Sequence, residues 1–222
     1  MTGAVTLCIP VYNGAAFVAA TLASALAQTY PHCRLLVSVE PSTDASWEIC
    51  ESYRQNPQVT VVAQPQRLGW VAHCNWLLQQ VQTPYFMLLP HDDLIAPHYV
   101  AAQLAVLQQH PDAVGSCSAI ACLGDYAGVV LPGYELRGAT LGRVVEMLEH
   151  RFDSIAFRAV FRHLGTQTPL IPHQQHQDYA ADTAWILAWA QRGELWCLPE
   201  PLYQKRFYPQ STHAQWKHQR DD

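Results

Sequence analysis

Two adjacent carboxylates, Asp92 and Asp93, follow a run of apolar residues that ends at Pro90, with His91 between them and the run. A continuous apolar run of this length is typical of a strand buried on both faces, as in a parallel sheet covered by helices. Ligands of open α/β sheets bind beyond the carboxyl ends of such strands. Paired Asp residues there could hold a hard cation that itself binds phosphates. They could equally cap a helix or shape a turn.

The elements that would position these acids alternate between strands and helices in the first half of the chain. Apolar runs predict strands at 5–9, 35–39, 59–63 and 85–89. Helical spacing predicts helices at 17–28, 47–53, 70–80 and 97–109. This alternation indicates βαβ units and an α/β fold whose Rossmann-like, mostly parallel central sheet is flanked by helices.

The second half of the chain is less regular. The sequence predicts strands at 113–120 and 195–198, helices at 140–149, 155–163 and 179–191, and either a β-excursion or a loop within 115–142. Residues 166–177 are polar and look like a mobile flap. His173 and His176 lie three apart in it, where Pro172 favours a solvated loop over metal ligation. The tail after Trp216 is expected to be frayed.

Composition limits the classes of partner. Half of the 222 residues are hydrophobic and only 14% are charged, against a usual ~25%. The chain is therefore long and apolar enough for one substantial domain, expected to cover 1–222. The formal net charge of −5 argues against nucleic acid as a partner, because nucleic-acid binding needs a basic surface.

The cysteines and the lack of long apolar runs indicate a cytoplasmic protein. Seven cysteines show no C-x-x-C spacing, and Cys8, Cys50, Cys74 and Cys197 fall in apolar patterns, so we expect buried thiols in a reducing compartment. The N-terminus lacks a basic start followed by an apolar core, so no signal peptide is expected. No apolar run approaches the ~20 residues of a membrane span. Peripheral contact with a membrane is left open.

Several short motifs together resemble those of a known family. They are Pro10-Val11-Tyr12-Asn13, Gln28-Thr29-Tyr30-Pro31, Ser42-Thr43-Asp44, Gly69 through Asn75, His91-Asp92-Asp93 with Pro97, Asp182 through Gly193, Leu198 through Tyr203, and Arg206. Each motif is weak alone, but their order and spacing extend over most of the chain. The set resembles the family 2 glycosyltransferases of GT-A fold. These enzymes move a sugar from a nucleotide diphosphate donor to an acceptor hydroxyl, with inversion at the sugar carbon.

The resemblance implies a donor site at the ends of the first strands. Pro10, Tyr12 and Asn13 would form the first strand-to-helix turn, beneath the nucleotide base. Glu40 stands where the family usually has an Asp that accepts a hydrogen bond from the base. A uridine donor is expected on this ground, although Glu40-Pro41 departs from the usual Asp-Gly and leaves the base open.

The resemblance also implies a place for a cation. In the family's D-x-D element, Pro90 replaces the first Asp, and Asp92 keeps the metal-ligand position with Asp93 beside it. One carboxylate with diphosphate oxygens and water can hold Mg²⁺, and Mn²⁺ is also compatible with such oxygen ligands. His91 is a metal ligand, a phosphate contact or a satisfied loop residue, and we favour the last two roles.

Further cations could contact the diphosphate. Arg67, Lys205 and Arg206 are the candidates, because positive charge there would stabilise the leaving group. On the alternative interpretation each is an ordinary surface cation, which we favour for Lys205.

Asp182 is the candidate catalytic base. It matches the second residue of the family's E-D pair, with Ala181 in place of the Glu. Direct displacement needs a base that takes the proton of the acceptor hydroxyl, and a helix N-terminus would favour the ionised carboxylate. The alternative is an ordinary residue of the first helical turn.

Taken together, the resemblance implies an inverting transfer of a single sugar from a nucleotide-diphosphate donor, expected to be a UDP-sugar. The acceptor is an unknown glycan, lipid-linked or small molecule. Residues 1–115 would bind the donor, and residues 116–210 would bind the acceptor and carry out catalysis. The changes at Glu40, Pro90 and Ala181 keep a second hypothesis open, a non-catalytic nucleotide-sugar-binding or scaffold protein on the same fold.

Overall fold

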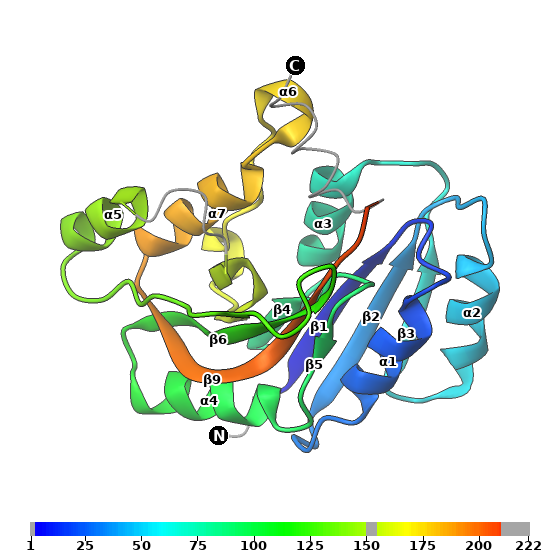
Figure 1. Cartoon of the computed structure of the whole chain (residues 1–222), viewed down its shortest axis with the longest axis horizontal. Helices are drawn as coiled ribbons and strands as arrows, with labels where there is room; N and C mark the ends of the chain where they lie inside the picture. Colours follow the sequence, from blue (N-terminus) through cyan, green and yellow to red (C-terminus); the bar gives the residue numbers. More distant parts are fainter. Residues whose placement is uncertain (1–2, 150–154, 210–222) are drawn as a thin grey trace.

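The computed structural model describes residues 3–149 and 155–209 of the chain. Within them, one mixed sheet runs in the order β3-β2-β1-β4-β8-β6-β9-β5, and β7 pairs with β6. Helices surround this sheet (Figure 1). The predicted α/β class and its mostly parallel sheet are confirmed. The tail after Trp216 lies outside the described residues.

The first half forms the parallel part of the sheet. Its strands pair side by side in the order β3-β2-β1-β4. They are β1 (Val5–Val11), β2 (Cys33–Val39), β3 (Val59–Ala63) and β4 (Tyr85–Leu88). The connecting helices are α1 (Val18–Leu26), α2 (Ser46–Ser52) with the 3-10 turn η1 (Tyr53–Gln55), and α3 (Trp70–Gln79). The consecutive residues Leu7, Cys8 and Ile9, which point to alternate faces, are all fully buried, as expected of a strand covered on both faces.

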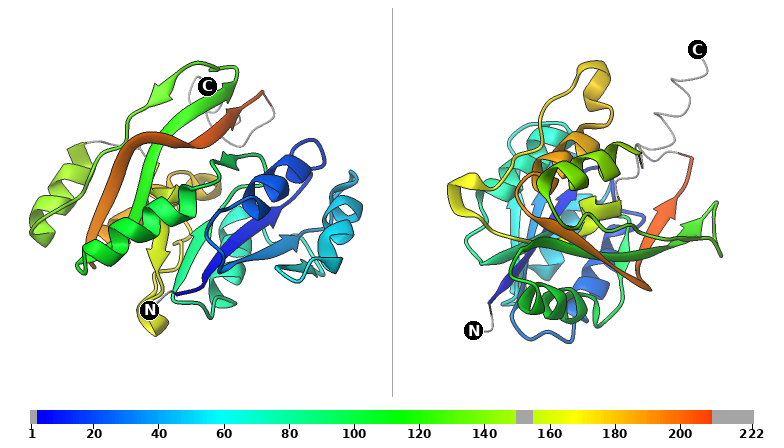
Figure 2. Two further views of the ribbon diagram at one scale, coloured as in Figure 1. Left: turned by 90° about the horizontal axis from the view of Figure 1, so that it is seen from below. Right: turned by 90° about the vertical axis from the view of Figure 1, so that its left-hand side faces the viewer.

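Two long strands dominate the second half. β6 (Ala113–Gly124) and β9 (Glu194–Phe207) pair in parallel and curve together away from β2 and β3 (Figure 2). Short strands complete the sheet: β5 (Leu94–Ile95) pairs with β9, while β7 (Val130–Leu131) and β8 (Val160–Arg162) pair with β6, all antiparallel. The helical elements are α4 (Tyr99–Gln109), α5 (Thr140–Glu149), η2 (Ile155–Arg158), η3 (Gly165–Gln167), α6 (Gln175–Asp178) and α7 (Ala181–Ala190). Figure 1 shows α5 at one end of the molecule and α2 at the other.

The prediction of a helix over 155–163 is wrong. Only η2 is helical there, and the chain then continues as β8. Phe161 pairs with Phe86 of β4, and Val160 pairs with Ser116 of β6. The β-branched and aromatic side chains fill the space between these two strands, so tertiary packing overrides the local helical pattern.

The strand predicted at 195–198 continues to Phe207, and the stretch 115–142 contains a β-excursion made by β6 and β7. Proline normally ends a central strand because it lacks an N–H group. Here Pro199 and Pro201 fall where the pairing between β6 and β9 shifts its register, after Ser118↔Leu198. The irregularity accommodates both prolines within β9, and pairing with β6 resumes at Tyr203.

The polar segment 166–177 is attached to two helices. The Asn75 side chain of α3 both donates to and accepts from the backbone of Ile171, at 2.8 Å in each case. The indole N–H of Trp185 donates to the Pro169 carbonyl oxygen, 2.8 Å away. The start of the predicted flap is therefore tied to α3 and α7.

All seven cysteines are free thiols, and six of them are buried. Cys197 is only partly buried, whereas Cys8, Cys50 and Cys74 lie in the core as predicted. Burial raises the pKa of Cys50 and of Cys74 to about 12, so these thiols stay protonated at neutral pH. The cytoplasmic location stays a prediction. Every helix in residues 3–149 and 155–209 is too short or too polar to cross a membrane.

Candidate active site

The loops after β1 and β2 are tied to each other by side chains. Asn13 accepts a hydrogen bond from the Thr43 backbone N–H at 2.9 Å, and its own N–H donates to Ser42 Oγ at 3.0 Å. Asp44 accepts from the Ala15 N–H at 2.9 Å. Asn13 has a φ of +46°, a left-handed conformation that Asn tolerates better than most residues. These bonds hold the turn after β1 in one conformation.

Tyr12 and Arg67 form a surface pair above this turn. The guanidinium carbon of Arg67 lies 4.1 Å from the centroid of the Tyr12 ring, which is within cation–π range. Tyr12 is half-buried and Arg67 is exposed. The pair therefore brings the loop after β3 against the loop after β1.

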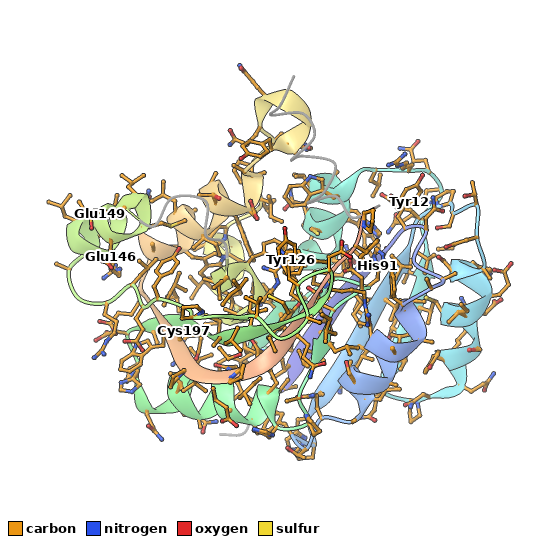
Figure 3. All side chains as sticks on the ribbon, viewed as in Figure 1. Tyr12, His91, Tyr126, Glu146, Glu149 and Cys197 are labelled. Atoms are coloured by element: carbon orange, nitrogen blue, oxygen red, sulfur yellow. The ribbon has the colours of Figure 1, made fainter. Side chains whose placement is uncertain are left out.

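The loop after β4 meets the same turn through His91. His91 Nδ1 lies 3.2 Å from the Pro10 carbonyl oxygen, and a Cβ added at Gly14 would come within 2.5 Å of the His91 ring. Only glycine fits at position 14 without displacing this ring. Figure 3 shows Tyr12 and His91 in the same part of the molecule, with Glu146 and Glu149 at its far end on α5.

Glu40 lies below the surface, not at it. Its side chain follows β2 and is 3% exposed. The Oε1 atom accepts hydrogen bonds from the backbone N–H groups of Leu68 and Gly69, at 2.8 and 3.1 Å. The expected contact between Glu40 and a nucleotide base stays a prediction, and this carboxylate already has protein partners in the loop that carries Arg67.

A buried polar chain continues from Glu40. His73 of α3 is 2% exposed; its Nδ1 lies 3.5 Å from Glu40 Oε1 and its Nε2 lies 2.8 Å from Ser38 Oγ. Gln64 Nε2 donates to the same Ser38 oxygen at 2.8 Å. Burial, and secondarily the charge of His91, lowers the pKa of His73 to about 4. The imidazole is therefore neutral at pH 7.

The adjacent carboxylates Asp92 and Asp93 have different environments. Asp93 is 2% exposed and accepts hydrogen bonds from the Tyr203 hydroxyl at 2.7 Å and the Arg206 backbone N–H at 2.9 Å. The Arg158 Nε lies 3.5 Å from its Oδ2. Burial raises the pKa of Asp93, and the charge of Asp92 adds to this. Both oxygens of Asp93 have protein partners, so this side chain supports the site from beneath.

Asp92 is more exposed than Asp93. The Tyr208 hydroxyl hydrogen-bonds to its side chain, and the Arg206 Nε donates to its backbone carbonyl at 3.2 Å. The Arg206 guanidinium lies 4.8 Å from the centroid of the Phe17 ring. The end of β9 thus packs against α1 beside Asp92.

Asp182 lies in the first turn of α7, which begins at Ala181, and Ala180 before the helix has a left-handed conformation with φ +58°. Its Oδ1 accepts a hydrogen bond from the Thr183 N–H at 2.9 Å. Burial lowers the pKa of the Arg158 guanidinium, but Tyr203 and then the charges of Asp93, Asp182 and Asp92 raise it, and the net shift is upward. Asp182 and Asp92 therefore both act electrostatically on the buried arginine that pairs directly with Asp93.

Lys205 is a second cation in this group, which we call the carboxylate cluster: Asp92, Asp93, Asp182, Arg158 and Lys205. Burial, followed by the charge of Arg158, lowers the pKa of Lys205 to about 8, while the three Asp residues oppose that shift. Lys205 is partly buried on β9, and its Nζ lies 4.7 Å from the centroid of the Phe207 ring, so it is not a fully exposed cation.

Arg158 is the buried cation of the cluster, and the sequence alone did not point to it. It belongs to η2, in the stretch that matches the family motifs least, and a lone Arg gave no signal there. Its position depends on β8, which inserts between β4 and β6. In the part of the chain that the structure describes, no three His, Cys, Asp or Glu side chains gather as a ready-made metal site.

The family is now decided by comparison with known proteins. A family model described as glycosyl transferase family 2 matches residues 6–169. The chain belongs to this family. The uncharacterized glycosyltransferase RT0329 of Rickettsia typhi is 31% identical over 113 residues, covering 47% of this chain and 32% of that protein. This chain thus spans about a third of that relative's length. An uncharacterized Haemophilus influenzae glycosyltransferase is 26% identical over 181 residues, covering 79% of this chain and 69% of that protein.

Solved structures show the same GT-A fold. S. aureus TarS 1–349 in complex with UDP-GlcNAc superposes with a TM-score of 0.74 at 16% identity, covering 96% of this chain and 60% of that one. The mannosyltransferase PcManGT of Pyrobaculum calidifontis, in complex with GDP-Man and Mn²⁺, gives a TM-score of 0.68 at 18% identity, covering 98% and 61%. At these identities the likeness supports the fold alone.

Proposed function

We propose that this family 2 member is an inverting glycosyltransferase. It transfers a single sugar from a nucleotide-diphosphate donor to an acceptor hydroxyl by direct displacement. The observation that carries the proposal is the carboxylate cluster: Asp93 pairs with the buried Arg158, and Asp92 and Asp182, far apart in sequence, both act electrostatically on Arg158 and Lys205. In this proposal, a donor held at Asp92 would have its reacting carbon near the second carboxylate, Asp182.

The nucleotide end of the donor would lie over the turn after β1. Tyr12 offers a half-buried ring, Arg67 a cation stacked on it, and Pro10 and Asn13 shape the turn beneath. We propose UDP as the nucleotide, because TarS, a structural neighbour, was solved with UDP and with UDP-GlcNAc. The GDP-Man complex of PcManGT makes GDP the competitor to test.

The diphosphate would lie between the nucleotide end and the carboxylate cluster. Arg206 of β9, which donates to the Asp92 carbonyl oxygen, Lys205 of the same strand, and His91, the residue before Asp92, are the side chains that would contact the diphosphate. Positive charge at this place stabilises the leaving nucleoside diphosphate as the glycosidic bond breaks.

A divalent cation fits Asp92. This side chain is partly exposed, so its oxygens have lone pairs left for Mg²⁺ or Mn²⁺ beyond the hydrogen bond from Tyr208. Mg²⁺ in such sites is commonly held by one or two carboxylates together with substrate phosphates and water. When bound, the cation would neutralise charge on the diphosphate. Asp93 would orient this segment from below and would not be a ligand.

Asp182 would act as the general base. Its carboxylate lies at the N-terminal turn of α7, where the helix dipole favours negative charge. It takes the proton of the acceptor hydroxyl as that oxygen attacks the sugar carbon from the face opposite the leaving group. The result is inversion at that carbon. The second half of the chain, in which α5 and α7 pack together, would bind the acceptor.

Calorimetric titration with UDP, CDP and GDP, each with and without Mn²⁺, tests the donor proposal. We expect UDP to bind most tightly and Mn²⁺ to strengthen its binding. The variant Asp92→Asn should lose the Mn²⁺ effect while keeping its circular dichroism spectrum. A Mn²⁺ effect that survives in Asp92→Asn would remove Asp92 from the site.

Turnover separates this proposal from its competitor, a non-catalytic nucleotide-sugar-binding protein. The departures at Pro90 and Ala181 are the observations behind that competitor. Incubation of UDP-sugars with a broad panel of glycan, lipid-linked and small-molecule acceptors should release UDP. Binding of UDP with no release of UDP across the whole panel would favour the scaffold.

A further inference from the structure

At the end of the site that would hold the nucleotide, the Glu40 carboxylate is buried, whereas Tyr12 and Arg67 reach the surface. The backbone of Glu40 is fixed, since its N–H donates to the Val11 carbonyl oxygen at 2.9 Å and extends the β1–β2 ladder. From that fixed point the side chain reaches Leu68 and Gly69 across the site. Its length therefore decides which groups it can touch.

The groups that Glu40 holds define the start of α3. Gly69 precedes the helix with a φ of +81°, and its carbonyl oxygen accepts the first helical hydrogen bond, from the His73 N–H at 2.8 Å. The N–H group of a residue at a helix start lacks an acceptor within the helix. Glu40 accepts from the N–H of Gly69, which precedes α3, and from the N–H of Leu68 before it. His73, one turn later, approaches the same oxygen.

We propose that Glu40 is a positioning residue: its carboxylate clamps the Leu68–Gly69 turn and so holds Arg67 on the Tyr12 ring. The base of the donor is then recognised by the Tyr12–Arg67 pair and not by the Glu40 carboxylate. This inference rests on the nucleotide-sugar donor proposed above. His73, Ser38 and Gln64 brace the clamp from the core.

The clamp explains why a Glu stands where the family usually has an Asp. A Glu side chain is one methylene longer, and that length spans the gap from the end of β2 to the Leu68 and Gly69 N–H groups. An Asp at position 40 would leave these two N–H groups without their acceptor. Two charge-assisted hydrogen bonds of this kind contribute enough free energy to hold a loop in one conformation.

Three substitutions at Glu40 test the clamp, with UDP and CDP as probes in calorimetry. Glu40→Ala and Glu40→Asp should weaken UDP and CDP alike, by about tenfold. Glu40→Gln keeps an oxygen that accepts both N–H bonds, so its affinities should fall less than about threefold. In all three the ratio of the UDP and CDP dissociation constants should equal that of the unmodified protein.

A direct contact with the base predicts the opposite pattern. Uracil presents an N–H donor at N3 where cytosine presents an acceptor, so replacing a carboxylate by an amide at a base contact would change the UDP-to-CDP ratio. Glu40→Asp would restore the family's usual residue and keep or improve UDP affinity. A changed ratio in Glu40→Gln, or full affinity in Glu40→Asp, would overturn the clamp.

Hydrogen exchange supplies a readout that needs no nucleotide. The Leu68 and Gly69 amides should exchange faster in Glu40→Ala and Glu40→Asp, and should stay protected in Glu40→Gln. Glu194→Gln is the matched control, because Glu194 holds the Gly138 N–H at 2.8 Å at another place in the fold. It should alter neither these amides nor nucleotide affinity. Unchanged exchange in Glu40→Asp would refute the clamp. Failure of the unmodified protein to bind any nucleotide would refute the proposed function alone.

Discussion

Different interactions hold together the two ends of this site: the nucleotide end, formed by the loops after β1, β2 and β3, and the reaction end, formed by the carboxylate cluster. At the nucleotide end, Asn13, Glu40 and His73 join neighbouring loops through hydrogen bonds to backbone or hydroxyl groups. At the reaction end, the carboxylate cluster places ions of both signs in and near the core. Hydrogen bonds fix the shape of the first region, whereas interactions between charged side chains dominate the second. We therefore expect shape changes to follow mutation in the first and charge effects in the second.

The largest effect should come from the reaction end. Asp182→Asn removes the proposed base and keeps the side chain's size, so turnover should fall by about 10²–10⁴-fold. UDP affinity and the circular dichroism spectrum should stay unchanged. The measurement is the rate of UDP release with whichever acceptor the unmodified protein uses.

Asp178→Asn is the matched control for that variant. Asp178 lies four residues earlier and accepts from the Gln174 N–H at 2.8 Å, and Asn tolerates its left-handed φ of +61°. Its turnover should stay within a few-fold of normal. Equal losses of turnover in Asp178→Asn and Asp182→Asn would mean that both substitutions disturb the structure of this segment, and that Asp182 is not the base.

Arg158→Met should have the next largest effect, on stability. It leaves Asp93 buried without its cation, a change that costs about 3 kcal/mol or more when one partner of a buried pair is lost. Denaturant unfolding gives the free energy. Arg54→Met removes an arginine from an exposed pair with Glu51 and should cost less than about 1 kcal/mol. Similar losses of unfolding free energy in both variants would show that the buried pair of Arg158 and Asp93 contributes no more to stability than an exposed pair.

The nucleotide end should respond to pH through His73. Its pKa of about 4 lies below the ordinary 6.5, so the unfolded chain binds the proton more readily than the folded one. Stability is therefore fully present above pH 6.5 and is lost as pH falls toward 4. Between pH 7 and 5 the loss from this residue is about 2 kcal/mol.

His73→Gln isolates that contribution. The variant cannot gain a proton on this side chain, so its free energy of unfolding should fall less between pH 7 and 5 than that of the unmodified protein. Denaturant titrations at both pH values measure the difference. Parallel pH curves for the two proteins would show that His73 titrates normally in the fold.

The smallest effect concerns the turn after β1. Asn13→Gly keeps the left-handed φ accessible but loses the bonds to Thr43, at a cost of about 1 kcal/mol. Asn13→Ala loses the same bonds and adds backbone strain, so it should cost about 1 kcal/mol more. Thermal unfolding ranks the two variants. Equal stability of both would mean that the positive φ of Asn13 carries no strain.

The sequence predicted the parallel half of the sheet because each element there has its own local signal. The strand at Val59–Ala63 was placed at its observed bounds, since an apolar run, a turn and an amphipathic helix follow one another. Asp92 was marked by its place after such a run. These features depend on residues close together in the chain, and local patterns are enough to reveal them.

Tertiary structure alone decided which charges meet. Arg158 lies in a segment whose helical pattern was misleading, and the insertion of β8 between β4 and β6 brings it to Asp93. Lys205 lies beside the Phe207 ring on the part of β9 that follows two prolines and a shift in its pairing with β6. Whether a carboxylate is exposed like Asp92 or buried like Asp93 depends on the strands that cover it. Those contacts join residues more than a hundred positions apart, and no local pattern encodes such distances because the energy of a buried charge depends on all of its neighbours at once.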